Sequence, residues 1–246
     1  MSSVSGFADQ SRVGRHFPTT RWSIIAASKQ TSDRSCSIAL EALCGAYWYP
    51  LYSYARWQGA TPENAQDLTQ GFFARLLEKH YLDDFDRERG RFRTFLLAAF
   101  RHYVANERER ERTQKRGSGQ VLIPLDVEDA ERCYRLEPSH NVTPEKIYEQ
   151  RWAVTLLERA LARLKFEAGS SPHFDTLRVF LTGNSPGTSY KELAARLGTT
   201  EAALKVAVHR LRRRFGVLLR KEIADTVAGP EEADDELHYL LSVLSS

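Results

Sequence analysis

Apolar residues recur every three or four positions along most of the chain, the period of a helix that buries one face. One such stretch covers residues 38 to 57 and ends at Gly59. Thr61 and Pro62 then favour a new helix, because threonine caps a helix and proline fits its first turn. Strand-like alternation is limited to 121–125, where Pro124 interrupts it. The pattern therefore predicts an all-α fold.

The helix that begins at Pro62 is expected to extend to about residue 79, and a polar break at 83–90 precedes a further helix from near Phe92. Its inward face would hold Ala65, Leu68, Phe72, Phe73 and Leu76. Residues 117–144 are rich in glycine, proline and acidic residues, which indicates a linker. Thr143 and Pro144 then open a long helix. The sequence thus predicts two helical domains joined by a linker. The expected segments are a flexible extension at 1–22, a first domain at 23–115, the linker at 116–144, a second domain at 145–228 and a C-terminal helix at 229–246.

The second domain has the pattern of a helix-turn-helix. Ser189 and Glu192 have capping-box spacing, in which Ser189 would accept from the Glu192 amide and the Glu192 carboxylate would reach back. Gly198 turns the chain, and the next helix, from about Thr200, has an inward stripe: Leu204, Val208, Leu211, Phe215 and Leu218. Its outward surface is basic, and no acidic residue lies between Lys205 and Lys221. A helix of this kind fits the major groove of DNA, where its cations contact phosphates.

The first domain contains an aromatic and arginine-rich helix that begins near Phe92. Aromatic rings beside arginines suit single-stranded DNA, because bases stack on rings while the backbone meets cations. Glu107, Glu109 and Glu111 dilute this charge, so the segment alone is a weak indicator of DNA binding.

Composition narrows the classes of function. The formal charge of +3 comes from 35 basic and 32 acidic residues, so only their distribution points to nucleic acid. No apolar run is long enough for a membrane span or a secretory signal, so we expect a cytoplasmic protein with no membrane contact. Three cysteines and seven scattered histidines show no metal-ligand spacing, and no phosphate loop or nucleophile motif occurs. We therefore expect no enzyme activity, no metal and no cofactor.

The order of these motifs resembles extracytoplasmic-function (ECF) sigma factors. Residues 67–73, Asp-Leu-Thr-Gln-Gly-Phe-Phe, precede the aromatic helix, and an acidic linker then leads to Ser-Tyr-x-Glu-Leu-Ala-x-x-Leu-Gly at 189–198 and Leu-Lys-x-x-x-His-Arg-Leu-Arg at 204–212. The similarity covers about residues 38–115 and 145–225. It implies a sigma factor that binds core RNA polymerase and directs promoter recognition, DNA melting and transcription initiation.

The resemblance also implies roles for particular residues. The polymerase clamp would be met by Asp67, Gln70 and Phe73. The segment from Asp83 to Arg93 would hold a flipped base. The minus-ten element would be contacted by Arg91, Phe92, Arg93, Arg101, Asn106, Arg108 and Arg110. The minus-thirty-five element would be contacted by Lys205, Val206, His209, Arg210 and Arg213.

The chain departs from the family pattern at the clamp surface. The family usually has acidic residues where Gln66 and Gly71 stand, so this surface is less negative than usual while the clamp it would meet is basic. Phosphorylation of Thr69 by a Ser/Thr kinase would restore negative charge and with it polymerase affinity, and so activate the protein. The alternative is that Thr69 is a half-buried helix residue. Regulation by a Ser/Thr kinase, by an anti-sigma factor or by the C-terminal segment is left open by the sequence.

Two other questions stay open from the sequence. An ordinary helix-turn-helix repressor or activator that acts on duplex operators, without replacing a sigma factor, is the main alternative function. The acidic and apolar C-terminal segment is predicted either to cover the basic recognition helix as a lid or to pack as a final helix.

Overall fold

The computed structural model describes residues 34–78, 91–113, 130–131, 134, 142–169, 173–181, 189–227 and 230–245. These residues form eight helices and no strand, so the all-α prediction is confirmed. The helices are α2 (Arg34–Trp57), α3 (Pro62–Glu78), α4 (Phe92–Thr113), α6 (Pro144–Ala168), α7 (Phe174–Arg178), α8 (Tyr190–Arg196), α9 (Glu201–Ala224) and α10 (Pro230–Leu244). The segment before residue 34 and the polar break at 83–90 lie outside the described residues.

Threonine caps explain where three of these helices begin. The side-chain oxygens of Thr61, Thr143 and Thr200 accept hydrogen bonds from backbone amides in the first turn of α3, α6 and α9, at 3.1 to 3.2 Å. Each bond satisfies an amide that has no partner within its own helix. The helix starts predicted from these threonines are therefore confirmed.

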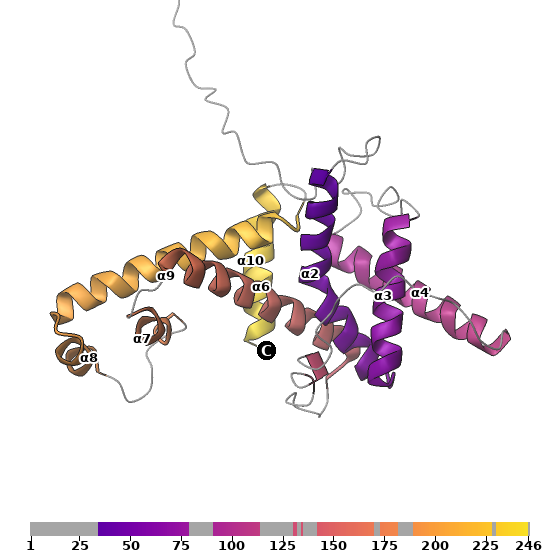
Figure 1. The fold of residues 1–246 in the computed structure, drawn as a ribbon, viewed down its shortest axis with the longest axis horizontal. Helices are drawn as coiled ribbons and strands as arrows, with labels where there is room; N and C mark the ends of the chain where they lie inside the picture. The colour runs from indigo at the N-terminus through magenta and orange to yellow at the C-terminus, as the bar shows by residue number, and fades with distance from the viewer. Residues whose placement is uncertain are drawn as a thin grey trace, which may run out of the picture.

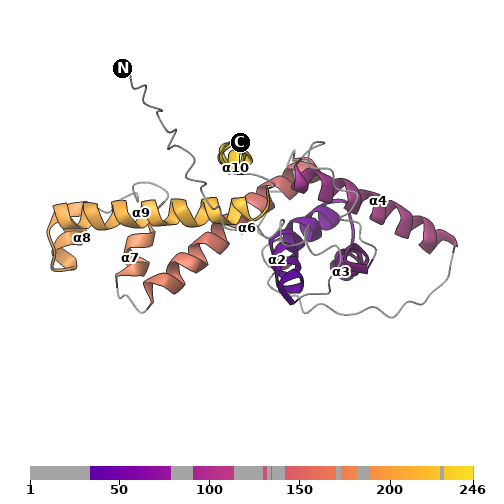
Figure 2. The same ribbon diagram turned by 90° about the horizontal axis from the view of Figure 1, so that it is seen from above.

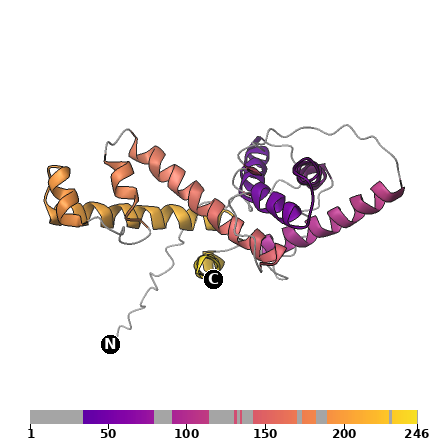
Figure 3. The same ribbon diagram turned by 90° about the horizontal axis from the view of Figure 1, so that it is seen from below.

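The helices lie along one long axis (Figure 1). The α7, α8 and α9 helices occupy one end, while α2, α3 and α4 form a bundle at the other. Seen from above, α6 runs from the α7 end toward that bundle and connects the two (Figure 2). It packs against α2 on one side and α9 on the other. The α10 helix lies crosswise against α6 and α9 and is seen end-on in Figure 3.

One large core unites helices from both sides of the predicted linker. Trp152 and Leu156 of α6 are fully buried in the same cluster as Tyr47 and Leu51 of α2 and Leu240 of α10. A separate, smaller core holds α8 against the first half of α9. The two expected domains therefore share one hydrophobic core in this structure.

The described part of the expected linker is attached to the end of α2. The Arg56 guanidinium makes two hydrogen bonds with the Glu131 carboxylate, at 2.9 and 3.0 Å, and lies 4.7 Å from the centre of the Tyr134 ring. The Tyr52 hydroxyl donates to the same carboxylate at 2.8 Å. Trp57 donates through Nε1 to the Val142 carbonyl at 3.0 Å. These contacts hold both ends of the linker's later half on one helix.

Candidate functional site

The outward surface of α9 is held in place by α8 and a short turn. Gly198 adopts a φ of +64°, a left-handed conformation that glycine takes without strain. Leu193 of α8 packs with Leu204 and Val208 of α9, so the opposite side of α9 faces solvent. Ser189 caps α8 by accepting from the Lys191 amide at 3.1 Å. The predicted bond to the Glu192 amide is thus wrong by one residue, although Ser189 caps the helix as predicted.

The five predicted minus-thirty-five residues all lie exposed on this surface: Lys205, Val206, His209, Arg210 and Arg213. Their charges are not equally available. Lys205 lies 2.6 Å from Glu201, and this hydrogen-bonded contact lowers the pKa of Glu201 and raises that of Lys205. An exposed pair of this kind contributes little, so a DNA phosphate can displace the carboxylate.

Arg210 and Arg213 differ from the other arginines of α9. Arg212 donates to the Phe180 carbonyl at 2.8 Å, and Arg214 forms a two-bond ion pair with Glu167. For Arg210 and Arg213, no acidic partner exists among the residues that the structure describes. These two guanidiniums are therefore the most available arginines of the helix.

The second candidate surface is α4, whose later half extends away from the bundle (Figures 1 and 3). Asn106, Arg108 and Arg110 are exposed there, and so is Arg101, earlier on the helix. Arg101 lies 3.6 Å from Glu145, and Arg110 lies 3.0 Å from Glu107. Both are exposed ion pairs that leave the arginines reachable for another anion.

The start of α4 does not match its predicted role as an open DNA surface. Phe92 is buried and packs edge-on against Tyr47, with ring centres 5.5 Å apart. Arg93 is only 6% exposed and pairs with the equally buried Glu236 of α10. Arg91, which is partly exposed, pairs with the same carboxylate. The sequence pattern missed this arrangement because the acidic partner lies more than 140 residues away in the chain.

The solvent-exposed side of α3 is narrower than the predicted polymerase-binding surface. Because α2 and α4 both pack against α3, Gln70 and Phe73 point into the core with 1% and 2% of their surface exposed. The expectation that they face the polymerase clamp is therefore not met in this fold. Asp67 is exposed as predicted, and Glu63 lies one turn before it on the same side. Its own backbone amide and the Thr61 hydroxyl lower the pKa of Glu63. The four-residue spacing from Asp67 would have indicated Glu63 from the sequence.

Thr69 is fully buried, and its hydroxyl donates to the Ala65 carbonyl at 2.7 Å. A kinase cannot reach this hydroxyl while α3 keeps its place between α2 and α4. The geometry therefore opposes phosphorylation of Thr69 and favours the alternative of a buried helix residue. Negative charge on this surface comes instead from Glu63 and Asp67.

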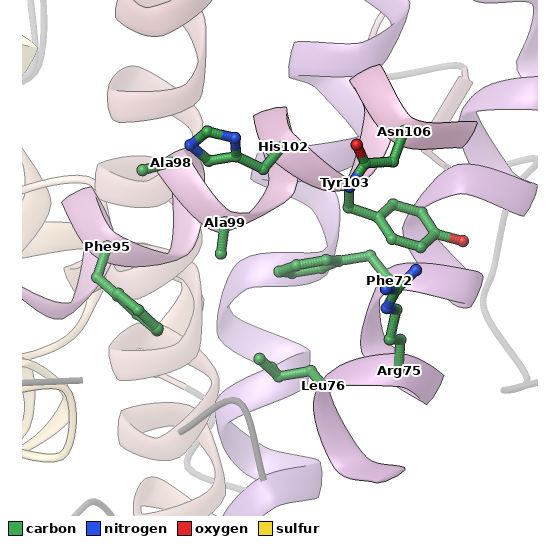
Figure 4. Close-up of a pocket in the computed structure, with 9 residues that line it drawn as sticks. All are labelled: Phe72, Arg75, Leu76, Phe95, Ala98, Ala99, His102, Tyr103 and Asn106. Carbon is green, nitrogen blue, oxygen red and sulfur yellow. The ribbon is translucent and has the colours of Figure 1, made fainter. Parts of the chain in front are cut away.

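A pocket of about 460 Å³ lies between α3 and α4 (Figure 4). Phe72, Leu76, Phe95 and Ala99 supply apolar surface, and polar groups stand around them. The polar lining consists of Arg75, His102, Tyr103 and Asn106. Rings beside hydrogen-bonding groups suit a nucleobase, because every base has a stacking face and a polar edge. Of these residues the sequence had indicated only Asn106.

The fold is helical and presents exposed arginines on two surfaces, the later half of α4 and the outward side of α9, as nucleic-acid-binding proteins commonly do. A comparison with protein families found a match to the family described as ECF sigma factor, over residues 51–223. The chain therefore belongs to the ECF sigma factor family, and it acts in promoter-directed transcription initiation with core RNA polymerase and promoter DNA as its partners. Comparisons with curated proteins and with solved structures found no match.

The described residues offer neither a metal centre nor a membrane span. No group of three or more histidine, cysteine, aspartate or glutamate side chains is placed to hold a metal ion there. None of the described helices is both long enough and apolar enough to cross a membrane.

Proposed function

We propose that this sigma factor binds the polymerase clamp through α3, contacts the melted minus-ten strand through α4 and binds the minus-thirty-five duplex through α9. The pair formed by Arg210 and Arg213 carries the proposal. These cations lie on the solvent side of a helix whose other side is fixed by its own small core. The α8–turn–α9 unit then acts as a helix-turn-helix with α9 in the major groove.

The separation between the α9 and α4 surfaces supports the assignment of a different promoter element to each. The exposed part of α9 and the projecting half of α4 lie at opposite ends of the molecule (Figure 1). Two separate promoter elements can therefore be contacted at once. The exposed side of Val206, which is 49% accessible, supplies an apolar group that suits a thymine methyl.

The polymerase contact is assigned to the exposed acidic strip of α3. Glu63 and Asp67 present two carboxylates one helical turn apart, and they would meet a basic clamp surface. This assignment replaces the buried Gln70 and Phe73 as direct contacts. Their role is to hold α3 against its neighbours.

The test is reconstitution with bacterial core RNA polymerase and a fragmented genomic library, followed by sequencing of run-off transcripts. Transcripts that start downstream of one shared pair of elements are expected. Failure to form a polymerase complex, together with sequence-specific binding to duplex DNA, would instead establish the helix-turn-helix repressor or activator.

The pocket between α3 and α4 leads to a second prediction. Replacing His102 and Asn106 with alanine removes two polar groups from its lining, and both residues are exposed, so the fold should be retained. We expect binding of the reconstituted holoenzyme to a pre-melted promoter to weaken by ~0.5–1.5 kcal/mol for each hydrogen bond that is lost to the base. Fluorescence anisotropy with a forked promoter measures this loss.

Ala105→Ser is the control for the pocket, since Ala105 is exposed on α4 but does not line it. It should bind the forked promoter like the wild type. Equal loss of binding to a duplex that carries only the minus-thirty-five element would show that the pocket has no special role.

A further inference from the structure

Glu236 of α10 lies at the centre of a buried ionic cluster. Its side chain is 3% exposed, and its two oxygens lie 2.5 Å from Arg91 Nη1 and from Arg93 Nε. One carboxylate therefore bridges two guanidiniums, each through a different oxygen. A phosphate group of a DNA strand offers the same arrangement of two anionic oxygens.

Arg93 is enclosed by further groups from α6 and α10. Its guanidinium carbon lies 3.9 Å from the centre of the Tyr239 ring and 5.2 Å from that of Trp152. The Glu149 Oε1 atom lies 3.7 Å from Arg93 Nη1. The Tyr148 hydroxyl donates a hydrogen bond to the Arg93 carbonyl oxygen at 2.9 Å. The start of α4 is thus fastened to the two helices that support α9.

The acidic residues of α10 do not cover the DNA-facing part of α9. Asp234 lies 3.4 Å from Arg220, near the end of α9, whereas Arg210 and Arg213 stay exposed. The sequence-based hypothesis of a lid over the recognition helix is therefore not supported. The helix covers part of the proposed minus-ten surface instead.

Burial makes the ion pairs of Glu236 less stable than the same contacts would be without a desolvation cost. Burial raises the pKa of Glu236 above its ordinary value, while Arg93 and Arg91 act in the opposite direction. The desolvation cost of the carboxylate therefore offsets much of its attraction to the arginines. An incoming phosphate that takes over the arginines lets this carboxylate return to water.

We propose that α10 is a built-in competitor of promoter DNA, in which Glu236 occupies the place of a backbone phosphate on Arg91 and Arg93. The inference rests on the proposed function, in which α4 contacts the minus-ten strand, and it adds Arg91 and Arg93, at the start of that helix, as contacts that become available once α10 leaves. In the free protein Arg93 is buried, Arg91 is partly exposed but paired with Glu236, and the start of α4 is held against α6 and α10. Binding of the melted strand displaces α10 and releases the start of α4.

The experiment uses the free full-length chain and a fluorescein-labelled single-stranded deoxyoligonucleotide of mixed sequence. Glu236→Gln keeps the shape of the side chain and removes its charge. We expect binding to tighten at least about fivefold, within the range of ordinary site-to-site coupling. Two newly available phosphate contacts should also steepen the slope of log K against log salt by about 1.4.

Asp235→Asn is the matched control, because it removes the same charge from an exposed neighbour on α10. Its affinity and salt slope should stay at the wild-type values. Adding Arg91→Ala to Glu236→Gln should cancel about 0.7 of the gain in slope, the share of one phosphate. Tyr239→Ala, which weakens α10 without changing any charge, should move affinity in the same direction as Glu236→Gln.

Circular dichroism establishes that each variant is folded. The proposal would be overturned if both Glu236→Gln and Tyr239→Ala kept the wild-type affinity for the oligonucleotide and the wild-type salt slope. It would also be overturned if Asp235→Asn gained as much affinity as Glu236→Gln. Run-off transcription with core polymerase separates this failure from failure of the proposed function. If the chain initiates transcription but Glu236→Gln does not bind single-stranded DNA more tightly, the competitor role of α10 is wrong and the sigma factor role stands. If Glu236→Gln binds more tightly but the chain does not initiate transcription, the proposed promoter contacts are wrong.

Discussion

Replacing Arg210 and Arg213 together with alanine is expected to abolish measurable binding to the minus-thirty-five duplex at moderate salt. Each arginine contributes ~1–3 kcal/mol if it contacts a base, and removing an arginine that binds a phosphate flattens the salt slope by about 0.9. Both side chains are exposed, so the fold should be unchanged. Titration of the promoter identified by the transcription assay, at several salt concentrations, measures both quantities.

The control for this pair is the double variant Arg214→Gln with Glu167→Gln. Arg214 lies on the same helix, but Glu167 already neutralises it through hydrogen bonds at 2.6 and 2.7 Å. Removing both charges leaves the net charge of the chain unchanged. Binding close to that of the wild type is expected. A decrease as large as that of Arg210 and Arg213 would show that general charge on α9, not the two available guanidiniums, determines affinity.

Features that depend on neighbours in the chain were predictable from the sequence. A threonine before a proline or before an acidic first turn determined where α3, α6 and α9 begin, and the structure shows the expected hydrogen bonds. The apolar stripe of α9 buries Leu204 and Val208 as predicted. Such signals are readable because the partners of each bond lie within one or two helical turns.

Features that depend on distant partners were not predictable. From the sequence, Arg93 is expected to be exposed and available to DNA, because arginine is rarely buried unless an acidic partner is near and none is adjacent in the chain. That partner, Glu236, belongs to the last helix of the chain. Gln70, which the resemblance assigned to the clamp, and Thr69, whose burial the sequence left open, are both buried because α2 and α4 pack on α3. A period of 3.6 residues identifies one buried face of a helix but not a second one.

The shared core also changes how the two expected domains should behave. The linker at 116–144 suggested independent units, yet Glu131 within it bonds to Arg56 and Tyr52 of α2. Trp152, eight residues after the start of α6, lies in one cluster with α2 and α10. The surface that would be exposed by separating the units includes these apolar residues, so we expect the units to stay together in the free protein.

Trp152→Ala is expected to lower the free energy of unfolding by about 3–5 kcal/mol, because it removes a fully buried indole and leaves a cavity. The substitution also withdraws the ring beside Arg93, so α10 should dock less firmly. Urea denaturation followed by circular dichroism measures the change. Phe166→Ala is the control, since this aromatic ring lies on the same helix but is 88% exposed, and its effect should stay within about 0.5 kcal/mol.

The shape of the unfolding curve carries a second result. If α2, α6 and α10 share one core, Trp152→Ala shifts a single transition that includes both halves of the chain. If instead the halves unfold separately, the substitution shifts only the transition that contains α6, and the other keeps its wild-type midpoint. A small decrease together with two separate transitions would contradict the shared core. It would also remove the structural basis for α10 as a competitor, because that role requires α4, α6 and α10 to be held together.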